Sequence, residues 1–306
     1  MTVIDLPQGW TWEGVLARLG EHADLERGAR RHGAIVRRRV IRNAAQLLRL
    51  VLAYVLSGLS LRSTAAWAEA AGQASFSDVA LLKRLKRCGP WLADLVGTLG
   101  AAANPDAVCA DVGRRVVAVD ATAVCSPDGK GKRYRLLHTV YDVGAQCFRA
   151  TLVTERSIAE RLDVGTVEPG EIRLGDRVYG RYDDLAAVQA AGADYVVRLS
   201  ATALKLATPN DEPFKRAALC RQAERAGVQE ASVLVRGRAR GHPPLAARVI
   251  VLALPSEKTG AARRRMRKKA RHWGYTPSAD ALVTAGCLML ITSLAPEDWP
   301  PRRLAR

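Results

Sequence analysis

The sequence is poor in acidic residues, in paired cysteines and in long apolar runs. Its 30 Asp and Glu stand against 47 Lys and Arg, which gives a net charge of +17 at pH 7. The longest near-apolar segment, ALVTAGCLMLITSLA at 281–295, is shorter than the roughly 20 residues that a membrane-spanning helix needs, so no membrane segment is expected. The first residues, MTVIDLPQGW, carry an acid where a signal peptide carries positive charge, and we expect a cytoplasmic protein.

Cysteine and histidine patterns give no sign of a zinc site or a disulfide framework. The six cysteines are scattered without a C-x-x-C pair, and the five histidines do not pair at ligand spacing. The cysteines therefore predict reduced, mostly buried thiols. His138, within RLLHTVYDV, is interpreted as a packed strand residue rather than a metal ligand.

Positive charge gathers in two runs that contain no acid. Residues 27–49 include eight arginines, and residues 258–272 include eight Lys and Arg. A large basic excess implies a polyanionic partner, most commonly nucleic acid. Either run alone is equally well explained as the solvated face of a helix, but two such runs in one chain favour phosphate binding. The length of 306 residues predicts two or three folded units.

The first part of the chain, to about residue 110, is predicted to be helical. Apolar residues recur at helical spacing over 40–56, with arginines on the remaining face. Ser60 and Ser77 stand where helix N-caps are expected, Gly72 stands at a helix end, and the Cys-Gly-Pro at 88–90 ends one helix and opens another.

Two of these short helices, joined by a small turn, have two interpretations. One is a helix-turn-helix reader of DNA, and the other is a helical packing module with a basic surface. The packing module is the commoner arrangement and is favoured slightly. The second helix carries Lys83, Arg84, Lys86 and Arg87.

After residue 114 the apolar residues recur in a pattern that is typical of strands rather than helices. A meander of three strands followed by alternation with a helix predicts a mixed α/β sheet. From residue 201, further strands and the basic helix predict an insertion that returns to the main sheet through LMLITSL. The predicted strands are 116–120, 136–143, 148–154, 172–175, 195–199, 231–236 and 246–254, and the predicted helix is 182–191.

Two aspartates occupy matching places in this plan. Asp120, in VVAVDATAV, is expected to close a buried strand, and Asp176 follows EIRLG at the end of another. Ligands of α/β sheets gather at the carboxyl ends of strands, and a buried carboxylate there must be paired or bound to metal. Because no His or Cys is near, Mg²⁺ or Mn²⁺ is favoured over zinc, and two such ions can promote phosphodiester cleavage. The alternative is that the aspartates cap following helices.

The order of VDATAV, GDRVYG and the basic helix with LITSL resembles the DDE transposases of bacterial insertion sequences, in particular the insertion-sequence-four family. The likeness covers 37–294 and includes the stretches RRRVIRNAAQLLRLVLAYVLSGLSLRSTAAW and SDVALLKRLKRCGPWL. It implies an RNase H-like core with a β-rich insertion, and Asp120 and Asp176 as the first two acids that bind Mg²⁺ or Mn²⁺. It also implies double-stranded DNA as partner, cleavage at element ends and strand transfer without a covalent protein intermediate, and it allows a homodimer in the DNA complex.

This resemblance divides the chain into four parts: a helical DNA-binding region at 1–110, the core at 111–200, the insertion at 201–280 and a return to the core at 281–306. Arg177 and Tyr179, which flank the second acid, either position the scissile phosphate or pack the turn, and packing is favoured slightly. The residues expected to contact DNA are Arg37, Arg38, Arg39, Lys83, Arg84, Arg177, Arg263, Arg264, Arg265, Lys268 and Lys269.

The sequence departs from this family at the third acid. The family carries a glutamate on a helix after the insertion, within a signature of spaced Tyr, Arg, Glu and Lys, whereas this sequence ends APEDWPPRRLAR. Glu297 stands among prolines, unlike a ligand borne on a helix. We therefore expect a truncated transposase. Two functions stay open: an enzyme that is complete only with downstream sequence, and an inactive DNA-binding protein that inhibits the full enzyme.

Overall fold

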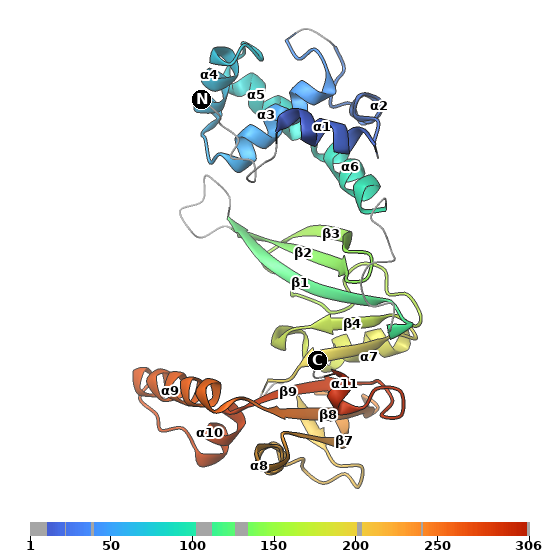
Figure 1. Ribbon diagram of the computed structural model, residues 1–306, viewed down its shortest axis with the longest axis vertical. Helices are drawn as coiled ribbons and strands as arrows, with labels where there is room; N and C mark the ends of the chain where they lie inside the picture. The colour runs from blue at the N-terminus through green and yellow to red at the C-terminus, as the bar shows by residue number, and fades with distance from the viewer. Residues whose placement is uncertain are drawn as a thin grey trace. The chain divides into compact units, whose positions relative to one another are not determined.

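The computed structural model divides into two compact units, which we call the helical unit (Met1–Asn104) and the sheet unit (Pro105–Arg306) (Figure 1). Arg38 and Arg39, which are expected to contact DNA, lie outside the residues that the structure describes. The described residues are 11–21, 23–37, 40–101, 112–125, 134–200, 204–239 and 241–304.

The helical unit packs amphipathic helices around an apolar core that includes Leu47, Leu50 and Trp91. The predicted caps are confirmed, because Ser60 and Ser77 each accept a hydrogen bond from the backbone N–H three residues on. Its helices are α1 (Trp12–Gly20), α2 (Leu25–Arg31), α3 (Ala44–Leu56), α4 (Leu61–Ala70), α5 (Asp78–Arg87) and α6 (Gly89–Ala101).

One predicted helix begins later than expected. The apolar pattern predicts a helix from residue 40, but α3 begins at Ala44. Asn43 has an extended backbone, and its side chain accepts the N–H of Gln46, which makes it the N-cap. A favourable cap therefore sets the boundary, and Val40 and Ile41 lie before the helix.

The sheet unit is built on one mixed sheet, and the predicted α/β class is confirmed. Its described strands follow the order β3-β2-β1-β4-β5-β9-β8-β7-β6. The strands are β1 (Val116–Cys125), β2 (Tyr134–Asp142), β3 (Cys147–Glu155), β4 (Ile172–Gly175), β5 (Asp194–Arg198), β6 (Lys205–Ala207), β7 (Val228–Arg236), β8 (Leu245–Ala253) and β9 (Cys287–Thr292). The helices are η2 (Arg177–Tyr179), α7 (Tyr182–Ala190), α8 (Arg216–Ala226), α9 (Ser256–His272), α10 (Ala279–Ala285) and α11 (Pro301–Leu304).

The strand directions are those of an RNase H-like arrangement. β1 pairs antiparallel with β2 and β2 with β3, whereas β1, β4 and β5 are parallel neighbours. β9 pairs antiparallel with both β5 and β8, so the strands after residue 204 extend the same sheet. α7 connects the parallel strands β4 and β5, which is consistent with an RNase H-like fold.

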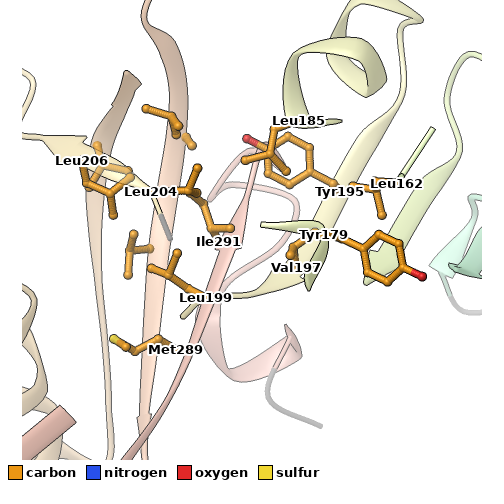
Figure 2. Close-up of a cluster of buried hydrophobic side chains, with 14 of the residues drawn as sticks. Leu162, Tyr179, Leu185, Tyr195, Val197, Leu199, Leu204, Leu206, Met289 and Ile291 are labelled. Atoms are coloured by element: carbon orange, nitrogen blue, oxygen red, sulfur yellow. The ribbon is translucent and has the colours of Figure 1, made fainter. Parts of the chain in front are cut away.

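The core of the sheet unit lies between the sheet and the helices α7 and α8. Figure 2 shows Tyr179, Leu185 and Tyr195 meeting Val197 and Ile291 in one buried cluster. All five side chains are fully buried. No helix among the described residues has the length and apolarity to cross a membrane.

Candidate active site and nucleic-acid surface

Asp120 lies in the middle of β1 and its side chain is exposed. The predictions that it closes the strand and that it is buried are both wrong. β1 continues to Cys125 because its second half keeps pairing with β2. Successive side chains of a strand point to opposite faces, so Val117 and Val119 enter the core while Asp120 points the other way. Its charge therefore carries no large desolvation penalty.

Asp176 directly follows β4, as predicted, and its side chain is also exposed. Its Oδ1 accepts the N–H of Val178 at 2.8 Å, which caps η2. The alternative interpretation, that this aspartate is a cap, is thus confirmed. The cap occupies one oxygen, and Oδ2 accepts no hydrogen bond from a described residue, so a metal-binding role is compatible with the cap.

The register of β1 against β4 brings the two aspartates together. The strands are parallel, with Val117 opposite Arg173 and Ala118 opposite Leu174. The backbone of Asp176 is still extended, at φ −81° and ψ −170°, so two further steps along each strand set Asp120 opposite Asp176. Neighbouring strands lie about 4.8 Å apart, which lets two carboxylates share one cation.

The chemistry of this pair fits a hard divalent cation. Two carboxylates without a thiol or imidazole suit Mg²⁺ or Mn²⁺, which usually keep several waters and take one or two protein carboxylates. Among the described residues, no group of three or more His, Cys, Asp and Glu side chains is placed to hold a metal ion. A metal-binding role of the two aspartates stays a prediction.

Glu297 lies in an exposed turn, at the end of the strands opposite to that of Asp176. β9 ends antiparallel to the start of β5, where the hydroxyl of Ser293 donates to Asp194 at 2.6 Å. β5 is parallel to β4, so the residues after β9 lie at the end of the sheet where β4 begins. Asp176 lies at the other end, where β4 finishes. This topology argues against Glu297 as a ligand that joins the two aspartates.

The basic helix α9 begins at the same end of the strands as Asp176. β9 starts where β5 ends, because the two strands are antiparallel. Ala253, at the end of β8, pairs with Cys287, at the start of β9. The chain enters α9 directly afterwards, at Ser256, as the ends of β8 and β9 in Figure 1 show. The sheet topology thus puts Asp176 and the start of the basic helix at the same end of the strands, with β5 and β9 between them.

The cations of α9 divide into two groups. Arg263 is half-buried: it donates to Glu224 at 2.6 Å and to the carbonyl of Leu282 at 3.0 Å, which anchors α9 to α8 and α10. The others are exposed and form no ion pair with a described residue. This second group, the free face of α9, consists of Lys258, Arg264, Arg265, Arg267, Lys268, Lys269 and Arg271.

Several arginines of the first basic run have acidic partners that the run itself does not contain. Arg30 pairs with Glu26, and Arg31 pairs with Asp94. The guanidinium of Arg49 lies 5.6 Å from the centroid of the Trp12 ring. These arginines are therefore less available to a polyanion than the acid-free run indicates.

The remaining predicted DNA contacts in this unit and beside Asp176 are placed as follows. Arg37 and Lys83 are exposed, whereas Arg84 is half-buried beside Leu81 and Phe76 at a small apolar pocket. Arg177 is exposed, and its role in DNA binding stays a prediction. α4 and α5 pack on each other, and this contact suits both the helix-turn-helix and the packing interpretation.

Two other side chains show what sequence reasoning found and missed. His138 is buried in β2, with Nε2 2.8 Å from the hydroxyl of Thr154, so the prediction of a packed strand residue is confirmed. Tyr179 is fully buried and packs the turn after Asp176, as favoured. Its hydroxyl has no hydrogen-bond partner among the described residues, which a sequence pattern cannot reveal.

A mixed α/β sheet with two aspartates on neighbouring strands and an exposed basic helix is compatible with a protein that acts on DNA. No protein-family model matches the chain. InsL, named as a transposase for insertion sequence element IS186A of Escherichia coli K12, is 35% identical over 297 residues, which are 96% of this chain and 80% of that relative. The transposase for element IS421 of Escherichia coli is 35% identical over 298 residues, with the same shares. The chain belongs to this family of insertion-sequence transposases, which confirms the resemblance to transposases of bacterial insertion sequences.

Proposed function

We propose that this chain binds the ends of an insertion sequence as double-stranded DNA and carries the metal-binding acids for DDE-type cleavage and strand transfer. The observation that carries the proposal is the parallel pairing of β1 with β4, which, extended by two residues, puts Asp120 opposite Asp176. Family membership supports the same reaction, because the named relatives are transposases.

In this mechanism Asp120 and Asp176 would hold Mg²⁺ or Mn²⁺. Such a cation, when bound, activates a nucleophilic oxygen and stabilises charge on the phosphate. The free face of α9 holds the DNA backbone by phosphate contacts, which position the duplex without reading its sequence. Arg177, exposed beside the second acid, supplies positive charge close to the reacting phosphate.

The proposed division of labour keeps the four predicted parts. Residues 1–110 bind the element ends, 111–200 carry the two acids, 201–280 form the insertion and 281–306 return to the core. A homodimer within the DNA complex would let two copies act on two element ends.

A second candidate function is DNA binding without cleavage, by which the chain would occupy element ends and inhibit transposition. It is favoured by the finding that the described residues contain no group of three or more His, Cys, Asp and Glu side chains that could hold a metal ion. Two carboxylates fix one ion, and a misplacement of reacting groups by about 1 Å costs on the order of 100-fold in rate. Cleavage of end-containing DNA by this chain with Mn²⁺ is therefore expected to be slow. A single-turnover rate of about 1 per second or faster, as is usual for enzymes, would contradict this candidate.

Duplex binding tests the proposal, through a variant of the free face of α9. Replacing Arg264, Arg265 and Lys268 with alanine removes three phosphate contacts, so the slope of log K against log[salt] should become shallower by about 2.7. Near 0.1 M salt, affinity should fall on the order of 100-fold for all duplex sequences alike. Fluorescence anisotropy with labelled duplexes measures both quantities.

The matched control for this variant is Arg263→Ala, on the same helix. Because Arg263 is engaged with Glu224 and Leu282, its loss should lower the melting temperature and leave the salt slope nearly unchanged. An unchanged slope in the triple variant, or a loss restricted to one DNA sequence, would refute phosphate binding by α9.

A further inference from the structure

A cavity lies between the beginning of α7 and the loop that joins β7 to β8. Its volume is about 360 Å³, which is within the range of about 300–1,000 Å³ that ligand sites of proteins occupy. One wall belongs to α7, and the other belongs to the strands and loop after residue 200. Neither of the two aspartates and no residue of the free face of α9 lines it. The cavity is therefore a separate feature of the sheet unit.

The loop after β7 is fixed on α7. The ring of Tyr182 stacks on the imidazole of His242, with the ring centroids 4.9 Å apart and the planes at 9°. The hydroxyl of Tyr182 donates to the carbonyl of Pro243 at 2.6 Å. Gly237 lets the loop fold back, because a Cβ at this position would overlap the side chain of His242. These contacts hold the two walls together, so the cavity is built into the fold.

Positive charge is concentrated in the lining. Lys205 in β6 and Arg236 in β7 are directly opposite each other in the strand pair, and Arg238 follows two residues later. Like charges at directly opposite positions of two strands repel each other and destabilise the sheet. An anion between these side chains would offset the repulsion. The cross-strand pair thus indicates a site for a negatively charged group.

Acidic side chains neutralise only part of this charge. Arg236 forms an ion pair with Asp211. Lys205 and Arg238 are exposed and form no ion pair with a described residue. Asp183 is the acid among the described lining residues, and it lies on the α7 side of the cavity. A bound anion is therefore expected on the other side, between Lys205 and Arg238.

We propose that this cavity binds a phosphate of the DNA backbone, held by Lys205 and Arg238. The inference rests on the proposed function, because that function brings DNA to the sheet unit. A free phosphate anion offers the same chemistry, and the experiment distinguishes the two sources. The contact adds to that of α9, and it positions the duplex without reading its sequence.

The test combines Lys205→Ala with Arg238→Ala in the full 306-residue chain, and the control combines Lys215→Ala with Arg302→Ala. The control residues are exposed, form no ion pair with a described residue and lie outside this cavity. In fluorescence anisotropy, loss of two phosphate contacts should make the slope of log K against log[salt] shallower by about 1.8. Duplex affinity should fall roughly 50-fold near 0.1 M salt. The control should change the slope by less than about 0.5. The exchange of Lys205→Arg with Arg238→Lys keeps both charges and should keep the slope of the parent.

Two results would overturn this inference. One is a cavity variant whose slope changes no more than that of the control. The other is calorimetric binding of inorganic phosphate that the cavity variant loses while its duplex slope stays that of the parent, which would assign the cavity to a small anion. If either occurs while replacing Arg264, Arg265 and Lys268 still lowers the slope, the proposed function stands. If the parent chain binds no duplex, both the inference and the proposed function fail.

Discussion

Mn²⁺ is expected to raise the melting temperature of this chain, and Asp120→Ala or Asp176→Ala is expected to abolish the rise. Metal that binds the folded state alone stabilises it by about 2.7 kcal/mol at 100 times its Kd, or roughly 5–10 °C for a unit of this size. The effect depends on both carboxylates, because register sets them opposite each other. Differential scanning fluorimetry over a range of Mn²⁺ concentrations measures it.

The metal-free behaviour of these variants should separate the two aspartates. Asp120 has no hydrogen bond from its side chain to a described residue, and removing it relieves repulsion between like charges, so Asp120→Ala should be no less stable than the parent. Asp176 caps η2, so Asp176→Ala should lose about 1 kcal/mol. Asp176→Asn keeps the cap and should lose only the response to Mn²⁺.

Asp183→Ala provides the control for general charge effects. Asp183 is an exposed acid in the first turn of α7, close in sequence to Asp176 but outside the pair. Its variant should keep the full response to Mn²⁺. If Asp183→Ala loses the response as completely as Asp120→Ala, the effect comes from net charge and the metal site is wrongly assigned.

Local signals in this sequence are sufficient for two helix N-caps. A serine before an apolar helix satisfies orphan N–H groups within one turn, so the caps at Ser60 and Ser77 could be read without tertiary information. The extent of β1 could not, because its exposed face carries Ala118 and Thr122, whose small side chains hide the alternation that marks a half-buried strand. The exposure of Asp120 was missed for this reason.

Pairing in space explains the other differences. The run 27–49 contains no acid, yet Arg31 in this run pairs with Asp94, which lies far along the chain. Arg263 likewise stands among free cations in sequence but is held by Glu224. α8 was missed because its buried positions include Ala217, Cys220 and Ala223, whose small side chains give a weak helical period. The adjacency of the two aspartates follows from strand register, which no spacing along the chain encodes.

Arg173→Met is expected to cost 3–5 kcal/mol of local stability around β4, on the order found when one partner of a buried ion pair is removed. Arg173 is fully buried, and Nε donates to the buried carboxylate of Glu171 at 2.6 Å. Nη1 donates to the carbonyl of Leu162 at 2.7 Å, and Nη2 donates to that of Thr166 at 2.7 Å. One guanidinium thus holds the segment 162–166 against β4, the strand directly before Asp176.

The control for this prediction is Arg161→Met, which breaks the ion pair of Arg161 with Asp163 at 2.7 Å. Because the side chain of Arg161 is 50% exposed, its loss should cost less than about 1 kcal/mol. The chain has two compact units, so a global unfolding curve would mix their transitions, and hydrogen exchange of the β4 amides is the appropriate measurement. The double variant Arg173→Met with Glu171→Leu removes both charges and should regain part of the loss, although the carbonyls stay unpaired. Equal costs for Arg173→Met and Arg161→Met would show that burial adds nothing to this guanidinium, and that the segment after Leu162 is held by other contacts.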